Sequence, residues 1–285
     1  MDSLHVEAMT DAAAAIERAG GYLTANPVEL NVIWSVMKQR ADSGAPGRYW
    51  LLEADDGIDG IAGLAIESAT GHPAAIAPVR RDHADAIAAA ISGEGHRLSG
   101  VVGEASATSA FAGCWAERVR TAAVVEDAQR LYALGRLVQP EAVPGRLRRA
   151  DLSEREMMIK WWSAFQVETG LPVSDVSPAV DLALSIGRLF VWDDAGARCM
   201  ARATGQLGGI SRIGAVFTPP QWRRRGYAAA CVGALCEWLR GEEGANSVLY
   251  AQLRNPSSNA IYRRLGFEAV SEVLAYRFDD VVNGK

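Results

Sequence analysis

Residues 216–228 read VFTPPQWRRRGYA, and this short segment carries more structural information than any other part of the chain. The largely apolar run 210–217 predicts a strand, and the pattern after Gly226 holds no charged residue until Glu237, which predicts a helix. A basic turn joins the two. The first N–H groups of a helix lack partners within it and carry partial positive charge, so this arrangement favours a bound anion.

The side chains of the turn indicate which anion would fit. Gly226 and Ala228 leave the backbone accessible, while Arg223, Arg224 and Arg225 supply guanidinium groups that suit phosphate. We therefore predict a pyrophosphate as the ligand. A basic helix start that is merely solvated is the alternative that the turn alone leaves open. The chain has no GxxxxGK[ST] loop, and no GxGxxG follows a predicted strand, which disfavours two other nucleotide-binding loops.

The spacing within the turn is similar to that of a known enzyme family. The acetyl-CoA loop of the GNAT N-acetyltransferases, written Gln/Arg-x-x-Gly-x-Gly/Ala, resembles Arg223-x-x-Gly226-x-Ala228 in this chain. Short glycine patterns recur by chance, so this motif alone is a moderate indication.

A second motif of the same family follows about thirty residues later. The family pattern, Asn-x-x-Ala-x-x-x-Tyr-x-x-x-Gly-Phe, resembles residues 255–267, which contain Asn255, Ser258, Tyr262, Gly266 and Phe267. Serine replaces alanine, one small residue for another. Two specific motifs in the family's order make the resemblance much stronger than either alone.

The resemblance implies a role for each matched residue. The strand backbone would pair with the pantetheine arm of acetyl-CoA, and the turn and first helical residues would hold its pyrophosphate. The implied cofactor-binding residues are Val216, Phe217, Thr218, Arg223, Arg224, Arg225, Gly226, Tyr227, Ala228, Ala229, Asn255 and Asn259. Tyr262 would protonate the departing thiolate, since a phenol with a pKa of about 10 is protonated at neutral pH. The spacing of Tyr262 alone also fits an aromatic packing residue.

The implied activity is acetyl-CoA-dependent N-acetylation of a primary amine on a small molecule or peptide, by direct attack in a ternary complex. Backbone N–H groups of the strand would polarise the carbonyl, with Gly214 marking a bulge that frees one of them. No general base is evident, because all four histidines lie before residue 97. Glu168, Asp175 and Asp193 are the nearest carboxylates, and each also fits a solvated surface charge. We therefore expect a water chain or an amine that binds already neutral.

Two other functions fit the same residues. An acyl-CoA-binding sensor or scaffold without chemistry is favoured by the missing base and disfavoured by Tyr262. A tandem acyltransferase acting on an amino-thiol metabolite would share only its domain arrangement with this chain.

The composition limits the remaining classes. The chain has 285 residues, of which 49% are hydrophobic, enough for two domains with proper cores. Its net charge of −5 argues against a nucleic-acid partner. The four cysteines form no C-x-x-C pair, so we expect no metal site and a reducing compartment. With no apolar stretch of about 20 residues, we expect no membrane partner. A cytoplasmic monomer or homodimer that binds acetyl-CoA and an amine acceptor is the resulting prediction.

Residues 138–145, with two prolines and a glycine, predict a linker between two domains. Residues 146–285 read as a complete α/β domain with a mixed sheet, the predicted catalytic GNAT domain. Residues 1–137 show a similar order of elements, but Asp82 follows the strand 74–79 and no glycine loop is present. We interpret this half as a degenerate GNAT-like domain that shapes or supports the active one; an unrelated α/β domain is the alternative. Among the predicted elements are helices at 11–19, 27–40 and 178–189, a strand at 121–125 and one or two strands at 268–278.

Overall fold

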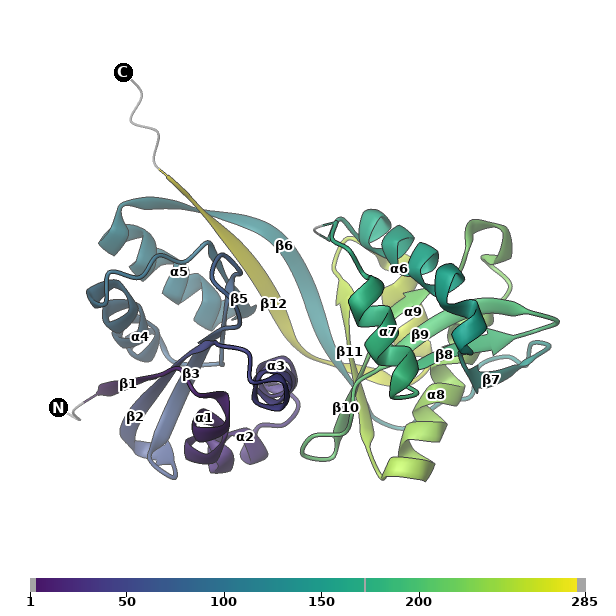
Figure 1. Cartoon of the computed structure of the whole chain (residues 1–285), viewed down its shortest axis with the longest axis horizontal. Coiled ribbons are helices and arrows are strands. Elements are labelled where there is room, and N and C mark those ends of the chain that lie inside the picture. Colours follow the sequence, from purple (N-terminus) through teal and green to yellow (C-terminus); the bar gives the residue numbers. More distant parts are fainter. Residues whose placement is uncertain (1–3, 172, 281–285) are drawn as a thin grey trace, which may run out of the picture. The chain divides into compact units, whose positions relative to one another are not determined.

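The computed structural model describes residues 4–171 and 173–280, which form two compact units. The first unit combines residues 4–131 with residues 271–280, and the second comprises residues 132–270. Both contain helices and strands, whose order along the sequence the reader can follow by the colours of Figure 1. Each unit is an α/β domain with a mixed sheet, so the predicted fold class is confirmed.

The first unit contains seven strands in the order β1-β2-β3-β4-β5-β12-β6. Their bounds are β1 (His5–Met9), β2 (Arg48–Ile58), β3 (Ile61–Glu67), β4 (Ala74–Ile76), β5 (Gly100–Glu104), β12 (Phe267–Asp280) and β6 (Thr121–Leu134). Strand β4 is parallel to β5, and β5 is antiparallel to β12. The helices are α1 (Ala12–Arg18), α2 (Gly20–Ala25), α3 (Asn31–Ser43), α4 (Arg81–Gly93) and α5 (Ala105–Val119).

The second unit has the strand order β7-β8-β9-β10-β11-β6-β12, with β6 and β12 each contributing one end. Its own strands are β7 (Arg146–Arg149), β8 (Leu189–Asp193), β9 (Ala197–Ala203), β10 (Ile210–Phe217) and β11 (Asn246–Gln252). The helices are α6 (Arg155–Thr169), α7 (Ser177–Ser185), α8 (Tyr227–Glu243) and α9 (Pro256–Arg264), with short 3-10 turns at Leu152–Glu154 and Pro220–Trp222. No helix within the described residues is both long and apolar enough to cross a membrane.

The two units follow the same plan. In each, four successive strands of the sheet pair antiparallel, and the fourth pairs parallel with the next strand. This parallel pair is β4–β5 in the first unit and β10–β11 in the second. A helix connects each parallel pair, α4 in the first case and α8 in the second. This matches the prediction that the two halves share one order of elements.

The boundary between the units differs from the predicted one. The predicted linker, residues 138–145, belongs to the second unit, where Val143 packs against the core and the indole of Trp192 donates to the carbonyl of Pro144 at 2.8 Å. Residues 271–280 belong to the first unit, because β12 pairs with β5 from Val273 to Arg277. Strand pairing between distant segments decides both assignments, and a composition shift does not show such pairing.

Two hydrophobic clusters cover opposite faces of the second sheet. Because strand side chains alternate, Cys199, Ala201 and Ala203 of β9 pack with α8, while Met200 packs with α6 and α7. The second cluster includes Trp161 of α6, and its partly buried neighbours include Trp162. Each face of the second sheet therefore has its own hydrophobic core and its own helices.

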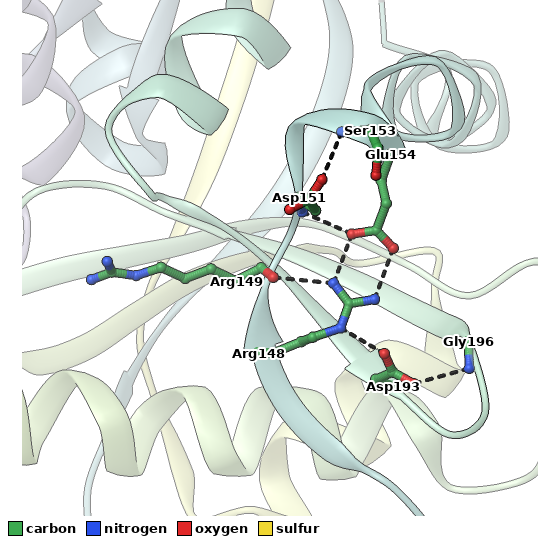
Figure 2. Close-up of polar contacts among 7 residues, drawn as sticks. All are labelled: Arg148, Arg149, Asp151, Ser153, Glu154, Asp193 and Gly196. Atoms are coloured by element: carbon green, nitrogen blue, oxygen red, sulfur yellow. Dashed lines mark hydrogen bonds and ion pairs between the residues drawn. The ribbon is translucent and has the colours of Figure 1, made fainter.

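An ion-pair network fixes the start of α6 against the hairpin of β8 and β9 (Figure 2). The guanidinium of Arg148 donates to both carboxylate oxygens of Glu154, at 2.7 and 2.8 Å, and to Asp193 at 2.6 Å. Asp151 caps the turn by accepting from the N–H of Ser153 at 2.8 Å. One arginine on β7 thus ties the turn before α6 to the end of β8.

Candidate functional site

Strand β10 pairs with β11 over only part of its length, and the candidate site lies where this pairing stops. Among the described residues, the parallel ladder runs from Ile210 and Asn246 to Ile213 and Leu249, whereas β10 continues to Phe217. On its other side, the register with β9 shifts between Gly214 and Phe217. The predicted bulge is confirmed, and Ala215 takes a positive φ of 47° there. Backbone groups beyond Ile213 can therefore pair with an extended ligand.

The turn after β10 leads into a helix with an open N-terminus. Gly226 is exposed, has a φ of 83° and occupies the N-cap position of α8, where no side chain caps the helix. The first intrahelical bond runs from the N–H of Ala230 to the carbonyl of Gly226 at 3.0 Å. The N–H groups of the preceding residues are thus free of intrahelical partners, and the dipole of this 17-residue helix adds positive potential.

The three arginines of the turn differ in their surroundings. Arg223 is held by Glu168 of α6, with 2.7 Å to each carboxylate oxygen, and also donates to the carbonyl of Thr218 at 2.9 Å. Arg225 lies over the ring of Trp222, 5.0 Å from its centroid. Arg224 is exposed and has a positive φ of 59°. The contacts of Arg223 thus hold the turn to α6 and to the end of β10, whereas Arg224 and Arg225 are exposed.

The remaining predicted residues of β10 and α8 line the same region. Val216, Ala228 and Ala229 are half-buried against the core under α8. Phe217 is buried against Trp161, with ring centroids 6.3 Å apart. The hydroxyl oxygen of Thr218 is buried and has no hydrogen-bond partner among the described residues. A buried polar atom without a partner at the end of this strand is consistent with a polar ligand there.

Tyr227 contributes through its backbone only. Its hydroxyl donates to the carboxylate of Asp194 at 2.6 Å, and this hydrogen bond raises the pKa of Tyr227 above its ordinary value. The side chain is thereby tied to the turn between β8 and β9, while its N–H remains at the start of α8.

Asn255 and Asn259 have structural partners. The side chain of Asn255 caps α9 by accepting from the N–H of Ser258 at 3.0 Å. The side chain of Asn259 is buried; it donates to the carbonyls of Gln252 and Asn255 at 2.9 and 2.6 Å and accepts from the hydroxyl of Tyr132 at 2.8 Å. Both asparagines therefore help to position α9.

Tyr262 is buried on α9, with rings of Tyr132 and Phe267 at 6.5 and 5.9 Å. Burial raises the pKa of its phenol above the ordinary value. The hydroxyl makes no hydrogen bond to the described residues. A phenol that stays protonated and has no fixed partner suits proton donation to a ligand atom.

None of the three candidate carboxylates has the properties of a base. Glu168 is bonded to Arg223, as described above. Asp175 accepts from Ser177, and this hydrogen bonding lowers its pKa. Hydrogen bonds from Gly196 and Arg148 lower the pKa of Asp193. A lowered pKa makes Asp175 and Asp193 weak proton acceptors at neutral pH, and the Glu168 carboxylate is occupied by Arg223.

The corresponding position in the first unit is filled by its own charges. Arg80 precedes α4, as the basic turn precedes α8, but its guanidinium donates to Asp56 at 2.7 Å and to Asp82 at 3.2 Å. It also lies 2.8 Å from the ring nitrogen of His83. These carboxylates would repel a phosphate at this position of the first unit.

Sequence reasoning missed a polar cluster on the sheet face under α6. Arg202 of β9, Arg212 of β10 and Tyr250 of β11 lie on this face, the face opposite α8. The available signal was a basic residue inside each of two otherwise largely apolar strands, at 202 and 212. Because no motif includes these positions, the predicted site residues did not include them.

The comparisons with known proteins agree with this geometry. A family model described as FR47-like protein matches residues 195–275, which include β10, the basic turn, α8 and α9. No curated protein matches the chain.

Several solved structures have a similar fold. An acetyltransferase of the GNAT family from Colwellia psychrerythraea is 10% identical, with a TM-score of 0.62 over 96% of this chain and 100% of its own. A GCN5-related N-acetyltransferase from Sphaerobacter thermophilus is 15% identical, with a TM-score of 0.54 over 95% of both chains. A tandem GNAT protein from the clavulanic acid biosynthesis pathway is 13% identical, with a TM-score of 0.55 over 95% of this chain and 98% of its own.

At these identities the structural likenesses establish the fold, and they do so over almost the whole chain. The match of residues 195–275 adds sequence similarity in the part that carries both motifs. The chain therefore has the fold of these GNAT acetyltransferase structures, and residues 195–275 in its second unit are similar in sequence to the FR47-like family model.

Proposed function

We propose that the chain is an acyltransferase that uses acetyl-CoA to acetylate a primary amine, with the site in the second unit. The observation that carries this proposal is the combination of incomplete β10–β11 pairing with the uncapped N-terminus of α8. One element supplies backbone partners for an extended arm, and the other supplies N–H groups for a diphosphate. The fold of the related structures supports acyl transfer in general.

The residues present fit acetyl-CoA. The exposed Gly226 leaves the helix start accessible, Arg224 and Arg225 supply positive charge, and the buried hydroxyl of Thr218 lacks a partner. Together they would hold the diphosphate and the adjoining part of the arm. Acetyl-CoA, when bound, supplies the activated acyl group as a thioester.

The reaction requires that the amine be neutral. Its nitrogen lone pair forms the new C–N bond at the acyl carbon while the C–S bond breaks, and the nitrogen then loses one proton. The sulfur takes up one proton, which Tyr262 would donate before regaining one from solvent. Backbone N–H groups at the bulge of Gly214 and Ala215 would stabilise the negative charge that develops on the carbonyl oxygen.

The proton released by the amine would pass to water. Glu168, Asp175 and Asp193 are engaged by Arg223, Ser177 and Arg148, respectively. No base therefore needs to be assigned to them, and binding of an already neutral amine is sufficient.

The test is an acetylation assay in which the full chain, acetyl-CoA and a panel of amines are analysed for free thiol and for acetylated product by mass spectrometry. The proposal requires thiol release that depends on an amine and equals the product formed. Tight binding of acetyl-CoA with no product from any amine would instead support the alternative, an acyl-CoA-binding sensor. This alternative is favoured by one observation: none of the three candidate carboxylates, Glu168, Asp175 and Asp193, has the properties of a base.

A further inference from the structure

Two arginines lie diagonally across neighbouring strands under α6. In the β9–β10 ladder, Arg202 lies opposite Gly214. The N–H of Thr204 and the carbonyl of Arg212 bond at 2.9 Å, which places those two residues opposite each other. Arg202 and Arg212 therefore lie on one face, two residues apart in register, within reach of each other's long side chains.

The space next to Gly214 on this sheet face is open. A Cβ atom placed on Gly214 would meet no heavy atom within 4 Å outside its chain neighbours. Because Gly214 faces Arg202 across the ladder, this space lies on the same sheet face as the two guanidinium groups. The glycine does not need a positive φ here, so its absent side chain is what keeps the space open.

The surroundings of this space are aromatic and partly desolvated. The guanidinium of Arg202 lies 5.8 Å from the ring centroid of Trp162. Tyr250 follows Leu249, the last β11 residue paired with β10, and acts electrostatically on Arg212. Burial lowers the pKa of Arg202. The pKa of Arg212 is lowered to about 10, chiefly by burial and also by the like charge of Arg202, while Tyr250 acts in the opposite direction.

The charge of Arg202 is not balanced by the protein. Its Nε is buried without a hydrogen-bond partner, and it forms no ion pair with a carboxylate among the described residues. A buried donor nitrogen without a partner is costly, and a bound anion that accepts from Nε would offset that cost.

We infer that the open space above Gly214 is an anion subsite for the acceptor, formed by Arg202 and Arg212, and that the acceptor amine carries a carboxylate close to its nitrogen. This inference rests on the proposed function for the reaction, but the subsite itself stands on the two arginines and the open space. It lies one residue from the bulge at Ala215, where the acyl carbonyl would be held. A carboxylate fits a planar guanidinium through two parallel hydrogen bonds, and an α-amino acid places its carboxylate two bonds from the nitrogen.

The first experiment compares matched acceptors with the full chain. The twenty α-amino acids, their carboxamides and the corresponding decarboxylated amines are assayed with acetyl-CoA, together with phosphoethanolamine as a phosphate-bearing amine. The inference predicts a kcat/KM at least a hundredfold higher for the best free acid than for its amide. Equal values for acid and amide, or a preference for phosphoethanolamine, would overturn it.

The second experiment uses variants. Arg202→Gln and Arg212→Gln should each raise the KM for the free acid at least tenfold and reduce the preference over the amide, with acetyl-CoA affinity unchanged. Gly214→Val should raise the KM for the free acid at least tenfold by filling the space, and it should also lower kcat, because Gly214 belongs to the bulge that would hold the acyl carbonyl. Arg240→Gln, exposed on α8, is the control and should behave as wild type. Unaltered KM values in all three variants would contradict the subsite.

A binding measurement separates this inference from the proposed function. N-Acetylated amino acids and their amides are titrated into the wild-type chain and followed by ligand-observed NMR. The subsite predicts that the carboxylates bind at least tenfold more tightly than the amides and that Arg202→Gln abolishes the difference, even if no turnover is found. Indistinguishable binding of carboxylate and amide would refute the subsite, whereas missing turnover alone would refute only the proposed reaction.

Discussion

Arg223 and Glu168 form a two-pronged ion pair, with both carboxylate oxygens 2.7 Å from one guanidinium nitrogen. The pair joins the basic turn to the end of α6, although 55 residues separate its partners. Arg223 also donates to the carbonyl of Thr218, at the end of the predicted acetyl-CoA strand. Arg223, the arginine that matches the family's loop pattern, thus fixes the shape of the turn. We propose that Arg224 and Arg225 contact the ligand.

Replacing Glu168 with Gln tests this division of roles. Both side chains are more than a third exposed, so the pair stabilises the fold by less than about 1 kcal/mol, and the variant should unfold at nearly the wild-type temperature. Its kcat should stay within a few-fold of wild type, because Glu168 is not the base. A hundredfold loss of kcat with an intact fold would reassign Glu168 to proton transfer.

Replacing Tyr262 with Phe should lower kcat at least tenfold and leave the Kd of acetyl-CoA unchanged, since only the proton donor is lost. No hydrogen bond to the described residues is removed, so thermal stability should be retained. Because burial raises the pKa of Tyr262 above its ordinary value of about 10, its ionisation should not lower kcat as the pH rises from 7 to 9. Wild-type kcat in the variant would leave Tyr262 as a packing residue.

Asn259→Ala should act on stability and not directly on ligand binding. The substitution leaves the hydroxyl of Tyr132 and the carbonyls of Gln252 and Asn255 without their partner, which typically costs about 1–3 kcal/mol. Urea unfolding measures this loss, and calorimetry of the folded protein with acetyl-CoA should give a Kd within a few-fold of wild type. A large loss of affinity in a variant of unchanged stability would show direct contact instead.

The network around Arg148 predicts a specific pH dependence. Hydrogen bonds lower the pKa of both Glu154 and Asp193 in the folded state. The two carboxylates therefore contribute fully to the free energy of unfolding above their pKa values in the unfolded chain. This contribution disappears as the pH falls through their lower pKa values in the folded chain. Arg148→Gln should therefore destabilise the chain at pH 7, by an amount of the order of 1 kcal/mol. At pH 2–3 the difference from wild type should shrink. Urea unfolding of wild type and Arg148→Gln at pH 7 and at pH 2–3 measures this difference. An equal difference in the free energy of unfolding at both pH values would contradict the linkage.

Local patterns predicted most elements of the second unit correctly. The turn at 193–196, the strand before the prolines and the helix after Gly226 all have short-range signals. The predicted helix at 178–189 ends earlier, at Ser185, since Gly187 adopts a positive φ of 64°. In the first unit α2 was not predicted, because two adjacent glycines at its start disfavour a helix that tertiary packing nevertheless stabilises.

Long-range pairing explains most of what the sequence did not show. The predicted strand 121–125 continues to Leu134, through a polar stretch that only partner strands can order. The closing segment is one strand, β12, and most of it belongs to the first unit. In the site, the motifs predicted the turn and its helix, but the partners of Arg223, Asn259 and Arg202 depend on contacts between distant segments.

The central claim is that the uncapped start of α8 holds the diphosphate of acetyl-CoA. Its most direct test is calorimetric titration of the full chain and of Gly226→Val, with Gly241→Ala as a control glycine on the same helix. A side chain at Gly226 would adopt an unfavourable positive φ, and its Cβ would come within 2.8 Å of Val143.

The account predicts one acetyl-CoA site per wild-type chain, at least tenfold weaker binding in Gly226→Val, and wild-type affinity in Gly241→Ala. Unfolding curves identify any variant that fails to fold, and Gly226→Ala then replaces it as the smaller change. Wild-type affinity in folded Gly226→Val, or two sites per chain, would contradict the account.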